Sequence, residues 1–313
     1  MLACAAAISL AVGVPAARAD WTPALGLPKL DRAAQRETIA TLRKGAALGN
    51  RADVFAKLGD SISQSPAYLQ GLGCGQWNLG RYSDLRPTIR QFASRPLRGE
   101  SSECGRTNSF SRNSAAARGF AMSFWAIEAG GSSDPSCATT ESPLVCELRL
   151  VRPAYALIMF GANDVNVALG FHGDPTPSFL ANTGQIIATA RRLGVVPVLS
   201  TIPPRGDAVD TALATEQLNA GLRRLAANRH APLINLWRAL APLPNHGLNP
   251  DGLHLSVSGW PGCARPCDPN LCAPLCRAAN FTPAGLAYGS DARNLITLLT
   301  LRRLSALAPH QRR

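Results

Sequence analysis

Four polar residues in this chain have the side chains that ester cleavage requires. Ser61 follows the apolar run 54–58, and Asp251 and His254 stand close together about 190 residues later. A serine hydroxyl becomes a nucleophile when a histidine accepts its proton and a carboxylate orients that histidine. Asn163 follows a second apolar run, and its amide could stabilise the oxyanion that forms during attack. In this order, the four residues indicate an ester-cleaving enzyme.

Three short motifs around these residues resemble those of the SGNH, or GDSL-type, hydrolase family. Gly59-Asp60-Ser61-Ile62 is similar to the nucleophile block of that family, with Ile in place of the usual Leu. Gly161-Ala162-Asn163-Asp164 is similar to its Gly-x-Asn-Asp block, and residues 251–256 to its Asp-x-x-His block. The resemblance spans roughly residues 50 to 305 and depends mainly on the shared order and spacing of the motifs.

The resemblance implies a role for each side chain. Ser61 is the expected nucleophile, His254 the base that takes its proton, and Asp251 the carboxylate that fixes the tautomer of His254. The backbone N–H of Ser61 and the amide of Asn163 are the expected donors of an oxyanion hole. The implied reaction needs no cofactor and no metal.

A third oxyanion donor is expected from the segment 108–119. The family uses the backbone N–H of a glycine there, and aligning Asn108 with the usual asparagine places Asn113 at the glycine position. A backbone donor needs no particular side chain, and asparagine tolerates left-handed backbone conformations better than most residues. Asn113 is therefore the first choice, with Gly119 and Ser114 as rivals.

Apolar runs and helical patterns alternate along the chain. This alternation predicts a parallel sheet covered by helices, with functional residues beyond the carboxyl ends of the strands. The family resemblance implies an α/β fold, a three-layer α/β/α sandwich around a central, mostly parallel, about five-stranded flavodoxin-like sheet. The expected strands are 54–58, 155–160, 195–202 and 232–236, and expected helices include 31–47 and 294–304.

Four segments follow from these patterns. We expect a signal peptide at 1–19, an N-terminal helical extension at 20–50, the hydrolase domain at 51–306 and a tail at 307–313. Within the hydrolase domain, the segments 64–150 and 260–280 are expected to be cysteine-containing insertions.

The N-terminus and the cysteines both indicate export. Residues 1–19 are almost entirely apolar or small and end in Ala17-Arg18-Ala19, the form of a cleaved signal peptide. We therefore expect a secreted or periplasmic protein. Besides Cys4, eight cysteines remain, an even number that predicts up to four disulfides in an oxidising compartment. They are Cys74, Cys104, Cys137, Cys146, Cys263, Cys267, Cys272 and Cys276.

Two of these cysteine groups have close spacing. Cys137 and Cys146 are near enough in sequence to pair with each other. The four cysteines between 263 and 276 could be a zinc site, because metal-binding cysteines also cluster, but the signal peptide favours disulfides.

Charge and hydropathy restrict the expected partners. The net charge is +12, but the arginines are scattered along the chain. The sequence has no basic block with interleaved aromatic residues, the pattern that is typical of nucleic-acid binding. After the N-terminal segment, no stretch has the ~18 apolar residues of a membrane span. We expect a monomer that acts on a small-molecule or polysaccharide ester.

Three functional hypotheses remain open at this point. The first is a secreted serine hydrolase of carboxylic esters, with short-chain, O-acetyl-carbohydrate or lipid esters as substrates. The second uses the same serine, histidine and aspartate in an envelope glycan O-acyltransferase. The third is a non-enzymatic, disulfide-rich secreted binding protein.

Overall fold

A computed structural model describes residues 21–101, 104–258 and 278–308. The predicted signal peptide, most of the predicted tail and the cysteines between 263 and 276 lie outside the described residues. Two disulfides lie inside them, Cys74–Cys104 and Cys137–Cys146, and the second is the pairing that sequence spacing predicts. The predicted segment boundaries stay a prediction.

A parallel sheet forms the centre of the molecule. Its strands lie in the order β1-β3-β4-β5, and each neighbouring pair is parallel. The strands are β1 (Arg51–Gly59), β3 (Pro153–Met159), β4 (Val196–Ser200) and β5 (Leu233–Ile234). Every residue of β3 and β4 is buried, as expected for strands with helices on both faces.

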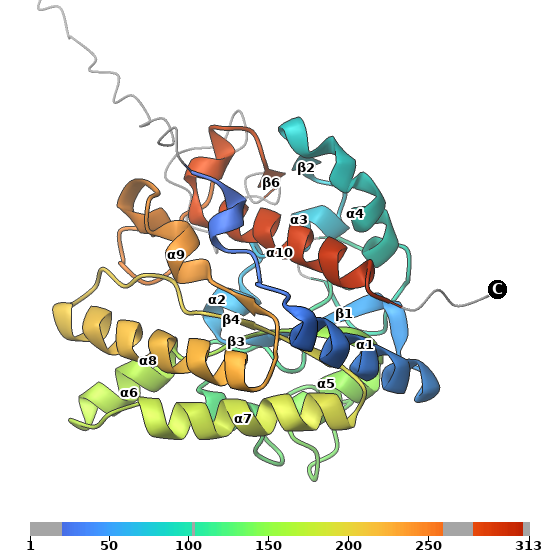
Figure 1. Cartoon of the computed structure of the whole chain (residues 1–313), viewed down its shortest axis with the longest axis horizontal. Helices are drawn as coiled ribbons and strands as arrows, with labels where there is room; N and C mark the ends of the chain where they lie inside the picture. The colour runs from blue at the N-terminus through green and yellow to red at the C-terminus, as the bar shows by residue number, and fades with distance from the viewer. Residues whose placement is uncertain (1–20, 102–103, 259–277, 309–313) are drawn as a thin grey trace, which may run out of the picture.

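Helices cover both faces of this sheet, which confirms the predicted α/β architecture. In Figure 1, α5 and α7 lie on one side of the strands, and α4 and α10 on the other. The longer helices are α1 (Arg32–Ala47), α4 (Arg86–Ala93), α5 (Pro143–Val151), α6 (Ala162–Gly170), α7 (Thr176–Arg192), α8 (Val209–Asn228) and α10 (Gly289–Ser305).

Short elements connect these layers. The short α-helices are α2 (Ser61–Gln64), α3 (Gln70–Gly73) and α9 (Leu236–Leu240). The 3-10 helices are η1 (Pro23–Leu25), η2 (Gly80–Leu85), η3 (Ser123–Ala126), η4 (Pro244–Gly247) and η6 (Gly285–Ala287). A separate two-stranded parallel sheet pairs β2 (Trp77–Asn78) with β6 (Ala279–Asn280).

The central sheet has four strands within the described residues, where about five were expected. Irregular chain covers the outer edge of β1 instead of a fifth strand. Among the described residues, only Ala117 pairs with that edge, through Gly59. The N–H of Phe55 donates to the Ser109 hydroxyl at 3.1 Å, and the Lys57 ammonium donates to the Phe110 carbonyl at 2.7 Å. Hydrogen bonds of side chains thus replace the regular backbone ladder at this edge, because irregular chain leaves polar groups that need hydrogen-bond partners.

Helix α10 is buried along nearly its whole length, unlike a surface helix. Its polar residues bond to distant parts of the chain. The Asn294 side chain accepts from the N–H of Leu69 and donates to the carbonyl of Ala67, at 3.0 and 2.9 Å. These bonds fix the segment after α2 against α10. In the part of the chain that the structure describes, no helix has the length and apolarity to cross a membrane.

Two helical glycines give opposite expectations for stability. A Cβ at Gly45 in α1 would lie 2.2 Å from the carbonyl oxygen of Gly194, whereas a Cβ at Gly184 in α7 would meet nothing within 4 Å. We expect Gly45→Ala to lower the free energy of unfolding by about 1–3 kcal/mol, because the helix must move away from the Gly194 turn. Gly184→Ala should raise it by about 0.5–1 kcal/mol. Urea denaturation checks both, and equal midpoints would contradict the close contact.

Candidate active site

The proposed nucleophile stands directly after the first strand of the sheet. Ser61 is the first residue of α2, and the buried carboxylate of Asp60 caps this helix by accepting from the N–H of Ile62 at 3.0 Å. Burial raises the pKa of Asp60 to about 6, and Asp60 Oδ2 has no hydrogen-bond partner among the residues that the structure describes. Asp60 therefore positions the turn that presents Ser61.

A chain of hydrogen bonds joins the three residues that the sequence singled out. Ser61 Oγ lies 3.0 Å from His254 Nε2, and His254 Nδ1 lies 2.7 Å from Asp251 Oδ2. A carboxylate can only accept here, so the Nδ1 atom must hold a proton, and a neutral imidazole then leaves Nε2 free to accept. The arrangement can remove the proton of the Ser61 hydroxyl.

The loop that holds the histidine is tied down locally. Asp251 Oδ1 accepts from the N–H groups of Leu253 and His254, each at 2.9 Å. Burial opposes ionisation of the Asp251 carboxyl, but these bonds and the imidazole outweigh it, so its pKa lies below the usual value. The Gly252 carbonyl accepts from the N–H of Gly206 at 2.8 Å, which connects this loop to the loop after β4.

Asn163 lies at the same edge of the sheet as Ser61. In the β1–β3 register Gly59 pairs with Met159, so Ser61 and Asn163 each follow a strand end within a few residues. Asn163 Nδ2 donates to the Ala121 carbonyl at 3.1 Å, which holds the amide in place. The second hydrogen of Nδ2 can donate to another acceptor. The neighbouring Asp164 carboxylate accepts from the N–H and hydroxyl of Ser123.

Two of the three candidates for the third oxyanion donor, Asn113 and Gly119, have backbone N–H groups that donate hydrogen bonds within the protein. The N–H of Asn113 donates to the Glu100 carbonyl at 2.8 Å, so it is engaged in the loop. The N–H of Gly119 donates to Gln64 Oε1 at 2.7 Å, and Gln64 belongs to α2. Because Ala117 pairs with Gly59, Gly119 and Ser61 each lie two residues past a paired position.

A cavity of about 570 Å³ opens beside Ser61 and His254. Asn113, Ser114 and Ala117 line one part of it. Asn163, Asp251 and Gly119 are not among its lining residues. The structure thus connects Ser61, His254 and Asp251 by hydrogen bonds. Asn113 lines the same cavity as Ser61 and His254.

Sequence reasoning missed two cations in the cavity wall, Lys57 and Arg293. Both are buried, with exposed fractions of 4% and 3%. The signal for Lys57 was a lysine inside an otherwise apolar strand, four residues before the serine. Arg293 gave no local signal, because only the structure shows that α10 is a buried helix.

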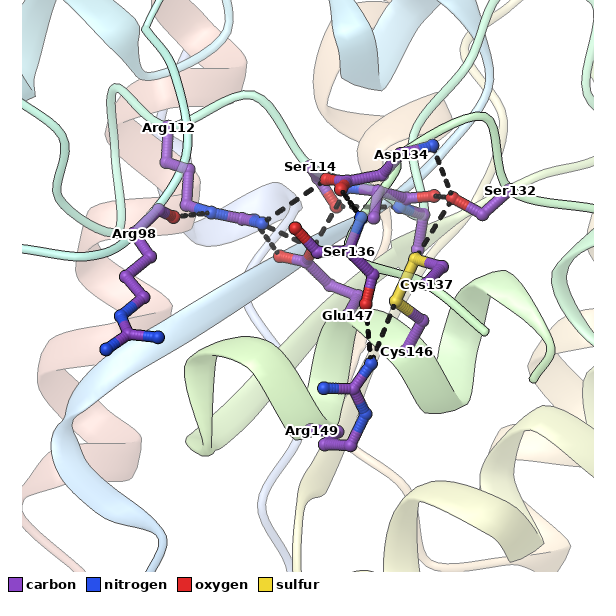
Figure 2. A network of polar contacts seen from close by, with 12 residues as sticks. Arg98, Arg112, Ser114, Ser132, Asp134, Ser136, Cys137, Cys146, Glu147 and Arg149 are labelled. Carbon is purple, nitrogen blue, oxygen red and sulfur yellow. Dashed lines mark hydrogen bonds and ion pairs between the residues drawn. A yellow bond between two sulfur atoms is a disulfide. The ribbon is translucent and has the colours of Figure 1, made fainter. Parts of the chain in front are cut away.

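A buried ion pair holds the loop that lines the cavity (Figure 2). Arg112 donates to both oxygens of Glu147 at 2.7 Å, and Glu147 also accepts from the N–H of Ala115 at 2.9 Å. Glu147 directly follows Cys146, whose disulfide to Cys137 lies beside the pair in Figure 2. The disulfide and the ion pair thus anchor the segment that contains Asn113 and Ser114.

The chain belongs to the GDSL-like lipase/acylhydrolase family, because the family matches residues 58–259, more than half of its length. It is therefore an enzyme, a hydrolase that acts on ester bonds. This assignment sets aside the hypothesis of a non-enzymatic binding protein. Among curated proteins, none matches this chain.

Several solved structures are similar in fold. One is an acetyl esterase mutant with acetate, at 16% identity and a TM-score of 0.43, covering 64% of this chain and 87% of that one. A lipase/acylhydrolase from Enterococcus faecalis has 19% identity and a TM-score of 0.40, covering 64% and 86%. A catalytic mutant of an acetylxylan esterase from Geobacillus stearothermophilus has 12% identity and a TM-score of 0.42, covering 80% and 93%.

A metal ion in a protein is held by a cluster of acidic, histidine or cysteine side chains. Within residues 21–101, 104–258 and 278–308, no group of three such side chains could hold a metal ion. The cysteines for which the sequence left a zinc site open lie outside these ranges.

The buried Glu147–Arg112 pair yields a stability prediction. Glu147→Gln would leave Arg112 as a buried cation without its carboxylate, so we expect the free energy of unfolding to fall by about 3–5 kcal/mol. Asp53→Asn is the matched control, because Asp53 pairs with Arg95 at the surface, where the side chains are 26% and 43% exposed. That change should cost less than about 1 kcal/mol. Equal losses in urea denaturation would show that burial does not strengthen the Glu147 pair.

Proposed function

We propose that this protein is a secreted serine hydrolase that cleaves carboxylic esters through an acyl-enzyme. The observation that supports this best is the hydrogen-bond chain from Ser61 through His254 to Asp251, with distances of 3.0 and 2.7 Å. It supplies a nucleophile, a base and an orienting carboxylate in contact with one another, next to a cavity that can admit a substrate.

The first half of the reaction forms the acyl-enzyme. Ser61 Oγ attacks the ester carbonyl carbon while its proton passes to His254 Nε2, and Asp251 stabilises the imidazolium. The tetrahedral intermediate then collapses, the bond to the alcohol oxygen breaks, and His254 returns the proton to the departing alcohol. Ser61 is left esterified.

The second half restores the serine. A water molecule gives a proton to His254 Nε2 and attacks the acyl carbonyl, and a second tetrahedral intermediate forms. When it collapses, the carboxylic acid leaves and Ser61 Oγ recovers its proton from His254. Water is the only co-reactant, and the reaction needs no cofactor.

Both intermediates carry a negative oxygen that needs hydrogen-bond donors. We assign this role to the N–H of Ser61, which has no acceptor inside its own helix because it is the first residue, and to the second hydrogen of the Asn163 amide. Gly119 is the preferred third donor. Its N–H donates to Gln64 Oε1 and can exchange this acceptor for the developing oxyanion.

The rim of the cavity favours a substrate with an apolar or ring-shaped surface. Phe120 lines the cavity, yet its side chain is 91% exposed, and its backbone has a positive φ of 61°. Such a conformation is strained for a bulky residue and is often retained at binding sites. The substrate is therefore a small-molecule or carbohydrate ester whose body packs on Phe120.

Two observations support export. Residues 1–19 have the composition of a cleaved signal peptide, and disulfides such as Cys74–Cys104 and Cys137–Cys146 form and persist in oxidising compartments. The site of action is therefore outside the cytoplasm.

Replacement of the nucleophile tests the proposal directly. Ser61→Ala should lower kcat for 4-nitrophenyl acetate by a factor on the order of 10⁶, because no other group can form the acyl-enzyme. Ser94→Ala, at an exposed hydroxyl that bonds to the Gln91 carbonyl, is the matched control and should retain full activity. Turnover by Ser61→Ala at the wild-type rate, with its circular dichroism spectrum unchanged, would refute the assignment.

Replacement of the oxyanion donor should act on the transition state. We expect Asn163→Ala to lower kcat by about 10²–10³ with little change in KM, because the amide bonds strongly only to the oxyanion. Asn228→Ala, at the end of α8, removes an exposed amide and serves as the control. A higher KM with unchanged kcat would instead place Asn163 in ground-state binding.

A further inference from the structure

The cavity beside Ser61 has an unusual charge distribution. Its wall includes the cations Lys57 and Arg293 as well as His254, but no aspartate or glutamate belongs to it among the described residues. Both cations are nearly inaccessible to solvent, at 4% and 3% exposure. Charge buried in this way is costly unless a counter-charge compensates it.

Lys57 has a neutral acceptor for one of its three hydrogens. Its ammonium group donates to the Phe110 carbonyl at 2.7 Å, and within the described residues no carboxylate forms an ion pair with it. Glu147 acts on Lys57 only from a longer distance, since the oxygens of Glu147 bond to Arg112 and Ala115. Burial lowers the pKa of Lys57 to about 7, so its charge is present on the acidic side of neutrality.

Arg293 also bonds to neutral groups. It donates to the Ile62 carbonyl at 2.7 Å and to the Ser63 hydroxyl at 3.0 Å, both in the helix that begins with Ser61. Its guanidinium lies over the Tyr68 ring, 3.5 Å from the ring centre. Asp60 acts on Arg293 through its charge, as Glu147 acts on Lys57.

An anion in the cavity would supply further counter-charge to Lys57 and Arg293. Charges interact across several ångströms in a partly buried site, so the anion need not touch both cations.

We propose that the preferred substrate is an ester with a negatively charged group, a carboxylate or a phosphate, which binds in this cavity near Lys57 and Arg293. The inference rests on the proposed function, because it concerns the substrate of the same serine. The charged group can belong to the acyl part or to the alcohol part of the ester, and the experiment below separates these two sources.

The test compares esters that differ only in charge. In the acyl arm, 4-nitrophenyl hemiglutarate is compared with 4-nitrophenyl valerate, which has an acyl chain of the same length. In the alcohol arm, O-acetylgalacturonic acid is compared with O-acetylgalactose by release of acetate. We expect kcat/KM to favour the charged member by about tenfold or more in one arm. Equal values in both arms would overturn the inference, even without any variant.

Substitution of the lysine assigns the preference. Lys57→Met should reduce the charged-to-neutral ratio of kcat/KM by about tenfold while hydrolysis of the neutral ester persists. Lys44→Met, on the exposed last turn of α1, is the matched control and should leave the ratio unchanged. A ratio that is the same in Lys57→Met and the wild type would show that Lys57 does not bind the anion.

The pH dependence gives a second readout. As pH rises from 6 to 8, Lys57 loses its proton, so the charged-to-neutral ratio of kcat/KM should fall. Glu147, Arg112 and Arg293 also act on Lys57, so the slope is assigned by its loss in Lys57→Met. Failure to hydrolyse any ester, neutral ones included, would contradict the proposed function itself and the inference with it.

Discussion

The parallel pairing of β1 with β3 is the constraint on which the site depends. Gly59, the last residue of β1, pairs with Met159, and a Cβ there would lie 2.3 Å from the Met159 carbonyl oxygen. Only glycine allows this approach. The register fixes where both strands end, and hence places Ser61 and Asn163 at one edge of the sheet. His254 then needs only to reach that edge, through a loop tied to the segment after β4.

Buried charged side chains are the second feature of the structure around the site. The Arg112–Glu147 pair is compensated and holds the cavity wall, while Asp60, Lys57 and Arg293 lie around the nucleophile without ion-pair partners within the described residues. Uncompensated buried charge is destabilising, so it is retained where it has a function. The Arg112–Glu147 pair therefore belongs to the scaffold, whereas Lys57 and Arg293 line the cavity beside Ser61.

Local patterns predicted most of the elements that position the site. The helix expected at 31–47 is α1, and the apolar run 155–160 coincides with β3 except at its ends. The terminal helix was expected at 294–304 but begins earlier, at Gly289, because its first turn is polar and its burial depends on neighbours that sequence periodicity does not show. Within the described residues the sheet has four strands, and hydrogen bonds of the Ser109 and Lys57 side chains take the place of a regular strand at the edge of β1.

The sequence by itself determined the chemistry, because the order and spacing of the Ser61, Asn163 and Asp251–His254 motifs are properties of the chain. It also determined the strand ends that present Ser61 and Asn163, since apolar runs stop where a strand leaves the core. Only the tertiary structure placed Lys57 and Arg293 in one cavity with Ser61. These contacts join residues far apart in the chain, so their geometry depends on how the sheet and α10 pack and not on any local pattern.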